Sequence, residues 1–238
     1  MIPNSSSDRL PKVIFFDAMG TLFDLKSSVG EIYGQFAHQH GVETDVIKLN
    51  EAFIKSYQAA PDLAFATTEL NASAEQEFIW WKNLVQTTFE SIEVLDRFSN
   101  FTDFFRELYV HFATKKPWYI YPDVVPCLEY WQQKKVELGI ISNFDSRLLT
   151  VLKALDLEHF FTSVTISSLA GFAKPDRNIF QIALEKHGFT AQQAWHIGDS
   201  KNEDYLGALN MGIRAFWLNR DGDLVNIKNQ LPNLSSLG

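Results

Sequence analysis

The feature that most constrains this chain is a short apolar run that ends in an aspartate. Residues 13–16 are Val, Ile, Phe and Phe, and Asp17 follows them directly. A continuous apolar run bounded by turn residues is typical of a strand that is buried on both faces of a parallel sheet. Such sheets present ligand-handling groups at the carboxyl ends of their strands. The run therefore predicts an α/β fold with Asp17 at its functional edge.

The second half of the chain supports this sheet because strand-like and helix-like patterns alternate along it. The predicted strands are residues 136–142, 163–167, 194–197 and 213–218. The predicted helices between and after them are residues 123–135, 145–155, 177–187 and 203–211, with Asp123 and Asp145 as N-caps. Alternation of this kind indicates a parallel, Rossmann-like sheet with helices on both faces.

The segment after the first strand is helical, rich in aromatic residues and free of strand-like alternation. Ser27 or Ser28 is expected to cap a helix that runs to residue 41, and Asp45 is expected to cap the next one. Further helices are expected over residues 73–89 and 102–113, with a loop at 59–72 that reaches over the site and a linker at 115–122. We therefore expect a catalytic core made of residues 1–24 and 117–238, and an inserted helical cap, residues 25–116.

Charge and composition exclude some classes of partner. The formal net charge is −8, which argues against a nucleic-acid or anionic-membrane partner but leaves an anionic small substrate open. No apolar run approaches the roughly 18 residues that span a bilayer. The single cysteine, Cys127, permits no internal disulfide, so we expect a reducing, cytoplasmic compartment.

Polar residues follow several of the predicted strands. Asp17 ends the first, Ser142 and Asn143 end the second, and Asp199 follows the strand at 194–197, while Lys174 lies in the loop before a proline. Because the carboxyl ends of parallel strands lie on one edge, these side chains are expected to converge.

These motifs, in this order and spacing, resemble the four motifs of the haloacid dehalogenase superfamily along nearly the whole chain. The helical insertion lies where that family places its cap. The flanking residues 141–148, 174–176 and 204–208 also resemble a subgroup of haloacid dehalogenase-like hydrolase-domain proteins.

The resemblance implies a role for each motif. Asp17 would attack phosphorus and form an aspartyl-phosphate. Asp17, Asp199 and the backbone carbonyl of Met19 would hold Mg²⁺ as hard oxygen ligands, and no other cofactor is expected. The transferring oxygens would be held by Ser142, Asn143 and Lys174. The expected supporting residues are Gly20, Thr21, Ser200 and Asp204, where Asp204 orients Lys174 or a metal-bound water, or forms only a structural salt bridge.

Met19 departs from the family pattern. The phosphatases of the superfamily usually carry at this position a second aspartate, which protonates the leaving oxygen and contributes about 10² to 10⁴ in rate. One interpretation is a Mg²⁺-dependent phosphohydrolase for small phosphorylated metabolites with good leaving groups, such as acyl phosphates. Another is a 2-haloacid dehalogenase, because halide leaves without a proton; those enzymes, however, use no metal and a cap arginine, and residues 25–96 contain no arginine. A third is a catalytically weak module that binds a phosphorylated ligand or a protein.

Two further features are expected to be structural. His196 lies within a predicted strand and is expected in the core. The adjacent Trp80 and Trp81 are expected in the core of the cap, and the remaining histidines show no metal-ligand spacing. The sequence does not indicate an oligomeric state.

Overall fold

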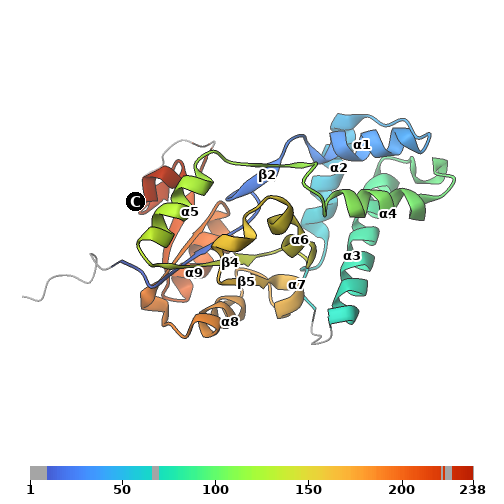
Figure 1. The fold of residues 1–238 in the computed structure, drawn as a ribbon. Helices are drawn as coiled ribbons and strands as arrows, with labels where there is room; N and C mark the ends of the chain where they lie inside the picture. Colours follow the sequence, from blue (N-terminus) through green and yellow to red (C-terminus); the bar gives the residue numbers. More distant parts are fainter. Residues whose placement is uncertain (1–9, 66–69, 221, 223–226, 238) are drawn as a thin grey trace, which may run out of the picture.

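The structure of the chain is a computed structural model that describes residues 10–65, 70–220, 222 and 227–237. A sheet with its flanking helices forms one end of the molecule, and helices α1–α4 form the other (Figure 1). This is the predicted α/β core with a helical cap inserted after the first strand.

A parallel sheet organises the core. Its order is β5-β4-β1-β6-β7-β8, and every pairing in it is parallel. The strands are β1 (Val13–Phe16), β4 (Glu137–Ser142), β5 (Ser163–Ile166), β6 (Ala194–Gly198), β7 (Arg214–Leu218) and β8 (Gln230–Leu231). The chain places β4 and β5 on one side of β1 and β6 to β8 on the other, so the strand order reverses beside β1. In open parallel sheets that reversal is where ligands bind.

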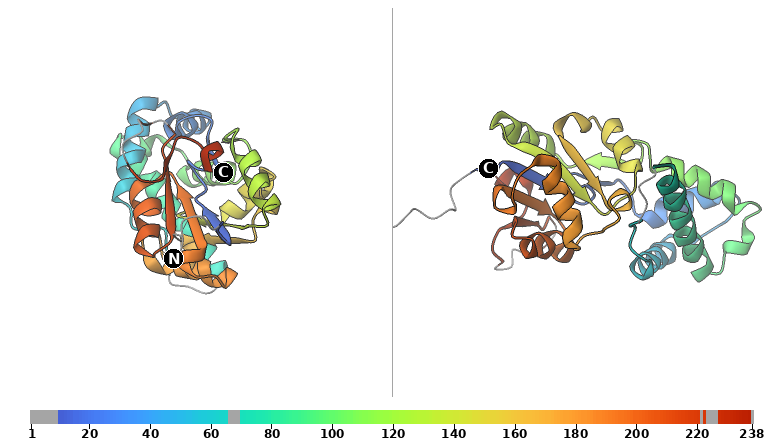
Figure 2. Two further views of the ribbon diagram at one scale, coloured as in Figure 1. Left: turned by 90° about the vertical axis from the view of Figure 1, so that its left-hand side faces the viewer. Right: turned by 90° about the horizontal axis from the view of Figure 1, so that it is seen from below.

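Both faces of β1 are covered, which explains its apolar run. Ile14 and Phe16 belong to the apolar cluster formed with α5 (Val124–Gln133) and α6 (Arg147–Ala154). Val13 and Phe15 belong to the cluster formed with α8 (Arg177–His187) and α9 (Gly207–Asn210). All four side chains are fully buried, and each contributes about 1.5–3 kcal/mol of burial free energy. The two helical layers on either side of the sheet are visible in Figure 2.

The cap is built from α1 (Val29–Gln39), α2 (Val46–Ala59), α3 (Leu70–Ser91) and α4 (Phe101–His111). Two predicted helix starts are confirmed: Ser28 forms a capping box with Glu31, and the Asp45 carboxylate accepts from two backbone N–H groups of the first turn. The helices enclose an aromatic core that includes Tyr33, Phe89 and Phe104. We keep residues 25–116 as the proposed extent of the cap.

The connections between cap and core were predicted incompletely. β2 (Phe23–Leu25) pairs antiparallel with β3 (Trp118–Ile120), so the linker predicted at 115–122 contains a strand. The rings of Phe23 and Trp118 meet edge to face with their centroids 5.3 Å apart. Three-residue strands have too little alternation to be recognised locally, and their partners lie far away in the sequence. The pairing joins both connections in one ribbon.

Other local predictions also need correction. Asp123 does not cap α5 with its side chain; its carboxylate instead accepts from Arg220 at 3.0 and 3.1 Å and from the Leu234 N–H at 2.6 Å. The predicted helix at 203–211 is a π-helix, Lys201–Leu206, followed by α9. Strand β8 and the short helix α7 (Ser167–Ala170) were not predicted. At Asp123 the ion pair with Arg220 replaces the helix cap. The sequence around residue 123 gives no sign of this partner, because Arg220 lies far away along the chain.

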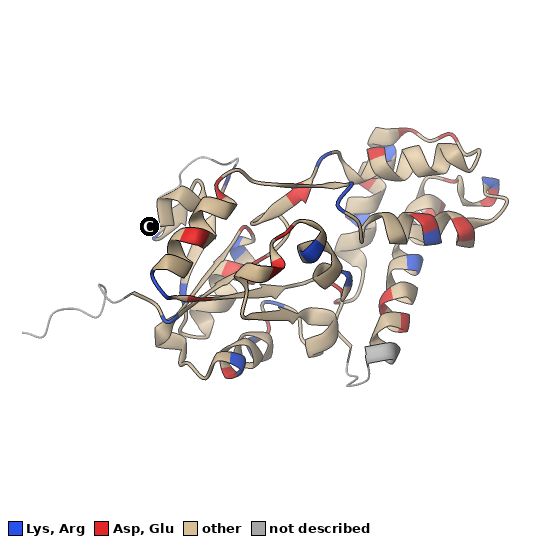
Figure 3. Cartoon of the chain, viewed as in Figure 1, with Lys and Arg blue, Asp and Glu red and all other residues tan. Residues whose placement is uncertain are grey.

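Basic residues do not gather on one segment. Lys and Arg are spread among Asp and Glu over both ends of the molecule (Figure 3). Within the described residues, no helix combines the length and the apolar character needed to cross a membrane.

Candidate active site

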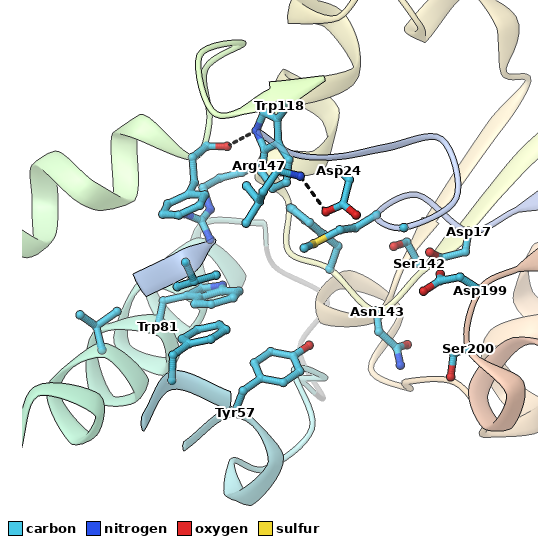
Figure 4. Close-up of a pocket in the computed structure, with 18 of the residues that line it drawn as sticks. Asp17, Asp24, Tyr57, Trp81, Trp118, Ser142, Asn143, Arg147, Asp199 and Ser200 are labelled. Atoms are coloured by element: carbon cyan, nitrogen blue, oxygen red, sulfur yellow. Dashed lines mark hydrogen bonds between the residues drawn. The ribbon is translucent and has the colours of Figure 1, made fainter. Parts of the chain in front are cut away.

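Three strand ends meet at the point where the sheet order reverses. Asp17 follows β1, Ser142 ends β4 and Asp199 follows β6, and β1 lies between β4 and β6 in the sheet. Figure 4 shows these three side chains beside one another, with Asn143 and Ser200 next to them. The sheet register thus brings the predicted residues to one edge.

Lys174 is the charge centre of this edge. Its ammonium donates to Asp17 Oδ1 at 2.7 Å and to Asp204 Oδ1 at 2.5 Å. Lys174 is 4% exposed, and its two partners are also buried. The two carboxylates raise the pKa of Lys174 against the opposing effect of burial, so it stays an ammonium. The same ammonium opposes the effect of burial on Asp17, whose pKa remains raised.

Asp204 is held in place by three groups. Besides Lys174, His196 Nε2 lies 2.9 Å from Asp204 Oδ1, and the Ser200 N–H donates to Oδ2 at 3.0 Å. Lys174 and His196 hold the pKa of Asp204 below its usual range despite its burial. Gly198 makes room for this carboxylate, because a Cβ there would lie 2.1 Å from Asp204 Cγ. His196 is in the core, as expected, and its contact with Asp204 was not foreseen.

Asn143 positions Lys174 through the backbone. Its side-chain amide donates to the Lys174 carbonyl at 2.9 Å and accepts from the Lys174 N–H at 2.7 Å. It also donates to Glu203 Oε2 at 3.2 Å. Asn143 therefore fixes the loop that carries the lysine. Glu203 lies inside the predicted 199–204 motif, but only the tertiary fold shows that it faces the site.

An acidic cluster completes the edge. Asp17, Asp199 and Asp204 each offer a carboxylate oxygen, and these atoms lie within 4.8 Å of one another. Asp199 itself is exposed, yet partial loss of solvent around its carboxylate and the neighbouring Asp17 and Asp204 raise its pKa to about 7. Three carboxylates close together beside the Lys174 ammonium suit a hard divalent cation such as Mg²⁺.

Gly20 and Thr21 shape the Asp199 side of the cluster. Gly20 has a φ of +79°, and a Cβ there would lie 2.6 Å from the Asp199 carboxylate. Thr21 Oγ1 donates to Asp199 Oδ1 at 3.3 Å, and Thr21 is fully buried. Only glycine combines this backbone conformation with so close an approach.

The repulsion at Asp199 gives a prediction for the metal-free protein. Its raised pKa means that the carboxylate destabilises the fold above about pH 7 and that this penalty disappears as the pH falls toward about 4. With chelator, Asp199→Asn is expected to melt a few degrees above the wild type at pH 8, and this gain should shrink toward pH 5. Differential scanning fluorimetry of both proteins measures the difference in melting temperature at each pH. The histidines titrate in both proteins, so their effect cancels in this difference. A pH-independent difference would contradict the assignment.

A cavity of about 370 Å³ lies between this edge and the cap. Asp17, Ser142 and Asp199 line one side of it, and aromatic cap residues line the other. Met19 also lines the cavity and is 39% exposed. Trp81 packs against the aromatic core of the cap, as expected, and it also lines the cavity and donates to Asp145 Oδ2 at 2.7 Å.

The cap is attached to the core beside the cavity. Glu77 of α3 is fully buried and accepts from the Ser146 N–H at 2.9 Å and from the Ser168 hydroxyl at 2.6 Å. The loop predicted at 59–72 does reach the core, because Ser167 Oγ donates to the Leu63 carbonyl at 2.7 Å. Its described residues do not line the cavity, and residues 66–69 lie outside the described part.

The comparisons with known proteins agree with this arrangement. The family model described as haloacid dehalogenase-like hydrolase matches residues 11–212. Haloacid dehalogenase-like hydrolase domain-containing protein 3 of Danio rerio is 31% identical over 90% of this chain and 88% of its own length.

Two solved structures share the fold equally well. A HAD phosphatase from Thermococcus onnurineus has a TM-score of 0.66 at 22% identity, covering 95% of both chains. A 2-haloacid dehalogenase from Pseudomonas syringae pv. Tomato DC3000 has the same TM-score and identity, covering 96% of both chains. Likeness of fold therefore does not separate the two chemistries. The family model and the relative at 31% identity show that this chain belongs to the haloacid dehalogenase-like hydrolases.

Proposed function

We propose that this hydrolase is a Mg²⁺-dependent phosphohydrolase that acts in the cytoplasm on a small phosphorylated metabolite through an aspartyl-phosphate on Asp17. The observation that carries the proposal is the acidic cluster of Asp17, Asp199 and Asp204 around one point beside the Lys174 ammonium. Haloacid displacement needs a nucleophile but no such concentration of metal-ligating carboxylates.

In the proposed mechanism Asp17 is the nucleophile. Lys174, bonded to its Oδ1, favours the ionised carboxylate that attacks phosphorus. Ser142 lines the cavity beside Asp17 and can donate its hydroxyl to a transferring oxygen. Asn143 holds the Lys174 loop, and His196 and the Ser200 N–H hold Asp204, so the ammonium is fixed before substrate arrives.

The Mg²⁺ would be held by Asp17, Asp199 and the Met19 carbonyl, with Asp204 behind them. When bound, it would supply positive charge that offsets repulsion between the carboxylates and the phosphoryl oxygens. The closeness of the three carboxylates, within 4.8 Å of one another, supports this proposal, because a bound cation would relieve their mutual repulsion.

The 2-haloacid dehalogenase remains the second candidate because of Met19. Halide departs without a proton, so a non-acidic side chain at this position would be no handicap. A haloacid, however, needs a cation for its carboxylate. Arg147 is the one Lys or Arg among the described residues that line the cavity, and it is already paired with Asp145 at 2.6 and 2.8 Å. This pairing favours the phosphohydrolase.

A panel of substrates tests the proposal. An aryl phosphate, acetyl phosphate and 2-chloropropionate are each supplied with Mg²⁺ or with chelator at one enzyme concentration. Phosphate release that chelator abolishes is the expected result. Chloride release that is indifferent to chelator would replace the proposal with the dehalogenase. Binding of a phosphometabolite without turnover would replace it with the binding module.

Met19→Asp is the sharpest test of the missing acid. A carboxyl at this cavity-lining position can protonate the leaving oxygen, a contribution of about 10² to 10⁴ in favourable cases. We expect kcat for a simple alkyl phosphate to rise about tenfold or more, whereas acetyl phosphate, whose leaving group needs no proton, should change little. Met19→Asn is the matched control, since it adds polarity without an acid. An equal rise in Met19→Asn would show that proton donation is not the limit.

A further inference from the structure

The cavity is lined at its cap end by a connected series of aromatic rings. The Phe53 ring lies 5.6 Å from Tyr33 and 5.9 Å from Tyr57, and Tyr57 lies 6.4 Å from Trp81, measured between centroids. Figure 4 shows Tyr57 and Trp81 across the cavity from Asp17 and Asp199, with the Tyr57 hydroxyl pointing toward the side that carries Asn143. The aromatic lining comes from all four cap helices and the connecting ribbon, and it includes Tyr33, Phe53, Tyr57, Trp81, Tyr109 and Trp118. Such a wall suits a flat apolar group by offset or edge-to-face stacking.

The charged side chains that line the cavity leave it with an excess of negative charge. Arg147 offers no net charge to a ligand, because its Nε and Nη2 both donate to the Asp145 carboxylate. Its Nη1 donates to the Tyr109 carbonyl at 3.0 Å, and its Cζ lies 3.7 Å from the centroid of the Tyr109 ring. Asp24 and Glu203 also line the cavity. Within the described part of the chain neither carboxylate has a salt bridge. A second negative charge on a substrate is therefore repelled, and a neutral or positive group is accepted.

Met19 restricts the bond that can be broken. With no acid in the position that the family's phosphatases use, the leaving oxygen departs as an anion. A phenol, with a pKa near that of tyrosine at about 10, forms a far more stable anion than an alkyl alcohol does. A phenolate can therefore leave without a proton donor, and its flat ring is also the kind of group that the aromatic wall can bind.

We propose that the substrate is an aryl phosphate whose aromatic group is uncharged or cationic and stacks on the wall formed by Phe53, Tyr57 and Trp81. This inference rests on the proposed phosphohydrolase function and adds the substrate class. In the step, a bond forms between an Asp17 oxygen and phosphorus while the bond from phosphorus to the aryl oxygen breaks. The aryl oxygen leaves with the electron pair and takes a proton from water; water then hydrolyses the aspartyl-phosphate to Asp17 and inorganic phosphate.

Three aryl phosphates with small tails of different charge test the charge rule. They are the phosphates of 4-ethylphenol, tyramine and 4-hydroxyphenylacetate, which carry a neutral, a cationic and an anionic tail on closely similar phenols. We expect kcat/KM for the anionic substrate to be about tenfold or more below that for the neutral one. The kcat/KM for the cationic substrate should equal or exceed that for the neutral one. Asp24→Asn should narrow the gap by about fivefold. Equal kcat/KM for all three, or a preference for the anion, would overturn the charge rule.

Variants of Tyr57 test the stacking wall. Tyr57 is 44% exposed, so truncation does not open the core. Tyr57→Ala should lower kcat/KM for 4-ethylphenyl phosphate about three- to tenfold, with Tyr57→Phe close to the wild type, because the ring and not the hydroxyl makes the contact. Ile54→Ala on the same helix, 45% exposed and away from the cavity, is the control. A loss in Tyr57→Phe as large as in Tyr57→Ala would contradict the stacking role.

Acetyl phosphate and glycerol phosphate separate the two levels of the proposal. We expect Mg²⁺-dependent release of phosphate from acetyl phosphate. We also expect kcat/KM for the aryl phosphates to be at least tenfold higher than for glycerol phosphate. If phosphate is released from acetyl phosphate but kcat/KM for glycerol phosphate equals that for the aryl phosphates, only the proposed substrate class is overturned. No release from any of these compounds overturns the phosphohydrolase function itself.

Discussion

Asp17→Asn is expected to lower kcat for phosphate release by about 10⁴-fold or more, because an amide oxygen is a poor nucleophile and no second group takes its place. The substitution keeps the size of a side chain that is 10% exposed and keeps an oxygen for the Lys174 ammonium, 2.7 Å away. It also removes one of the three clustered carboxylates. The fold should therefore survive, and in chelator the melting temperature should not fall.

The measurement is kcat on acetyl phosphate with saturating Mg²⁺, together with mass spectrometry of acid-quenched enzyme for a phosphorylated Asp17. Asp176→Asn is the control, since Asp176 is an exposed N-cap and asparagine caps equally well. Wild-type turnover in Asp17→Asn, or a phosphate adduct on another residue, would remove Asp17 as the nucleophile.

Lys174→Met is expected to have the second-largest effect, on stability as well as on turnover. It removes the cation that bonds both Asp17 and Asp204, so the buried Asp17 loses its ion pair and Asp204 keeps only His196 and the Ser200 N–H beside Asp199. Breaking a buried ion pair on one side typically costs about 3–5 kcal/mol. We expect a loss of this size in the free energy of unfolding at pH 7 with chelator, and loss of activity, because Lys174 also favours ionised Asp17.

The loss should depend on pH in a defined direction. The pKa of Asp204 is depressed in the folded protein and that of Lys174 is raised, so their pairing stabilises the fold between the unfolded-state values of about 4 and 10. The difference between Lys174→Met and the wild type should shrink as the pH falls below about 4, where the Asp204 carboxyl of the unfolded chain begins to protonate while that of the folded protein stays ionised. Urea denaturation at a series of pH values measures this. Lys153→Met, on the exposed surface of α6, should lie within about 0.5 kcal/mol of the wild type. Equal stability of Lys174→Met and the wild type at pH 7 would show that the pair does not hold the site together.

Much of the fold was predictable because its signals are local. The run at 13–16 predicted a strand buried on both faces, since each face of β1 must meet its own helical layer. Ser28 and Asp45 predicted helix starts because a cap acts within one turn. The order of Asp17, Ser142, Lys174 and Asp199 predicted one edge, because parallel strands must end together.

The chain by itself thus determined the sheet, the helix starts and which side chains gather at the sheet's edge. Only the tertiary structure decided the partners of the charged groups: Asp123 with Arg220, Asp204 with His196, and Arg147 with Asp145. It also decided that Trp81 faces a cavity and that β2 pairs with β3. The physical reason is range. Burial patterns and caps act within a few residues of the sequence. Ion pairs, cavity walls and strand pairing instead depend on how closely segments far apart in the sequence approach one another. That distance is a property of the folded chain and cannot be found in either segment alone.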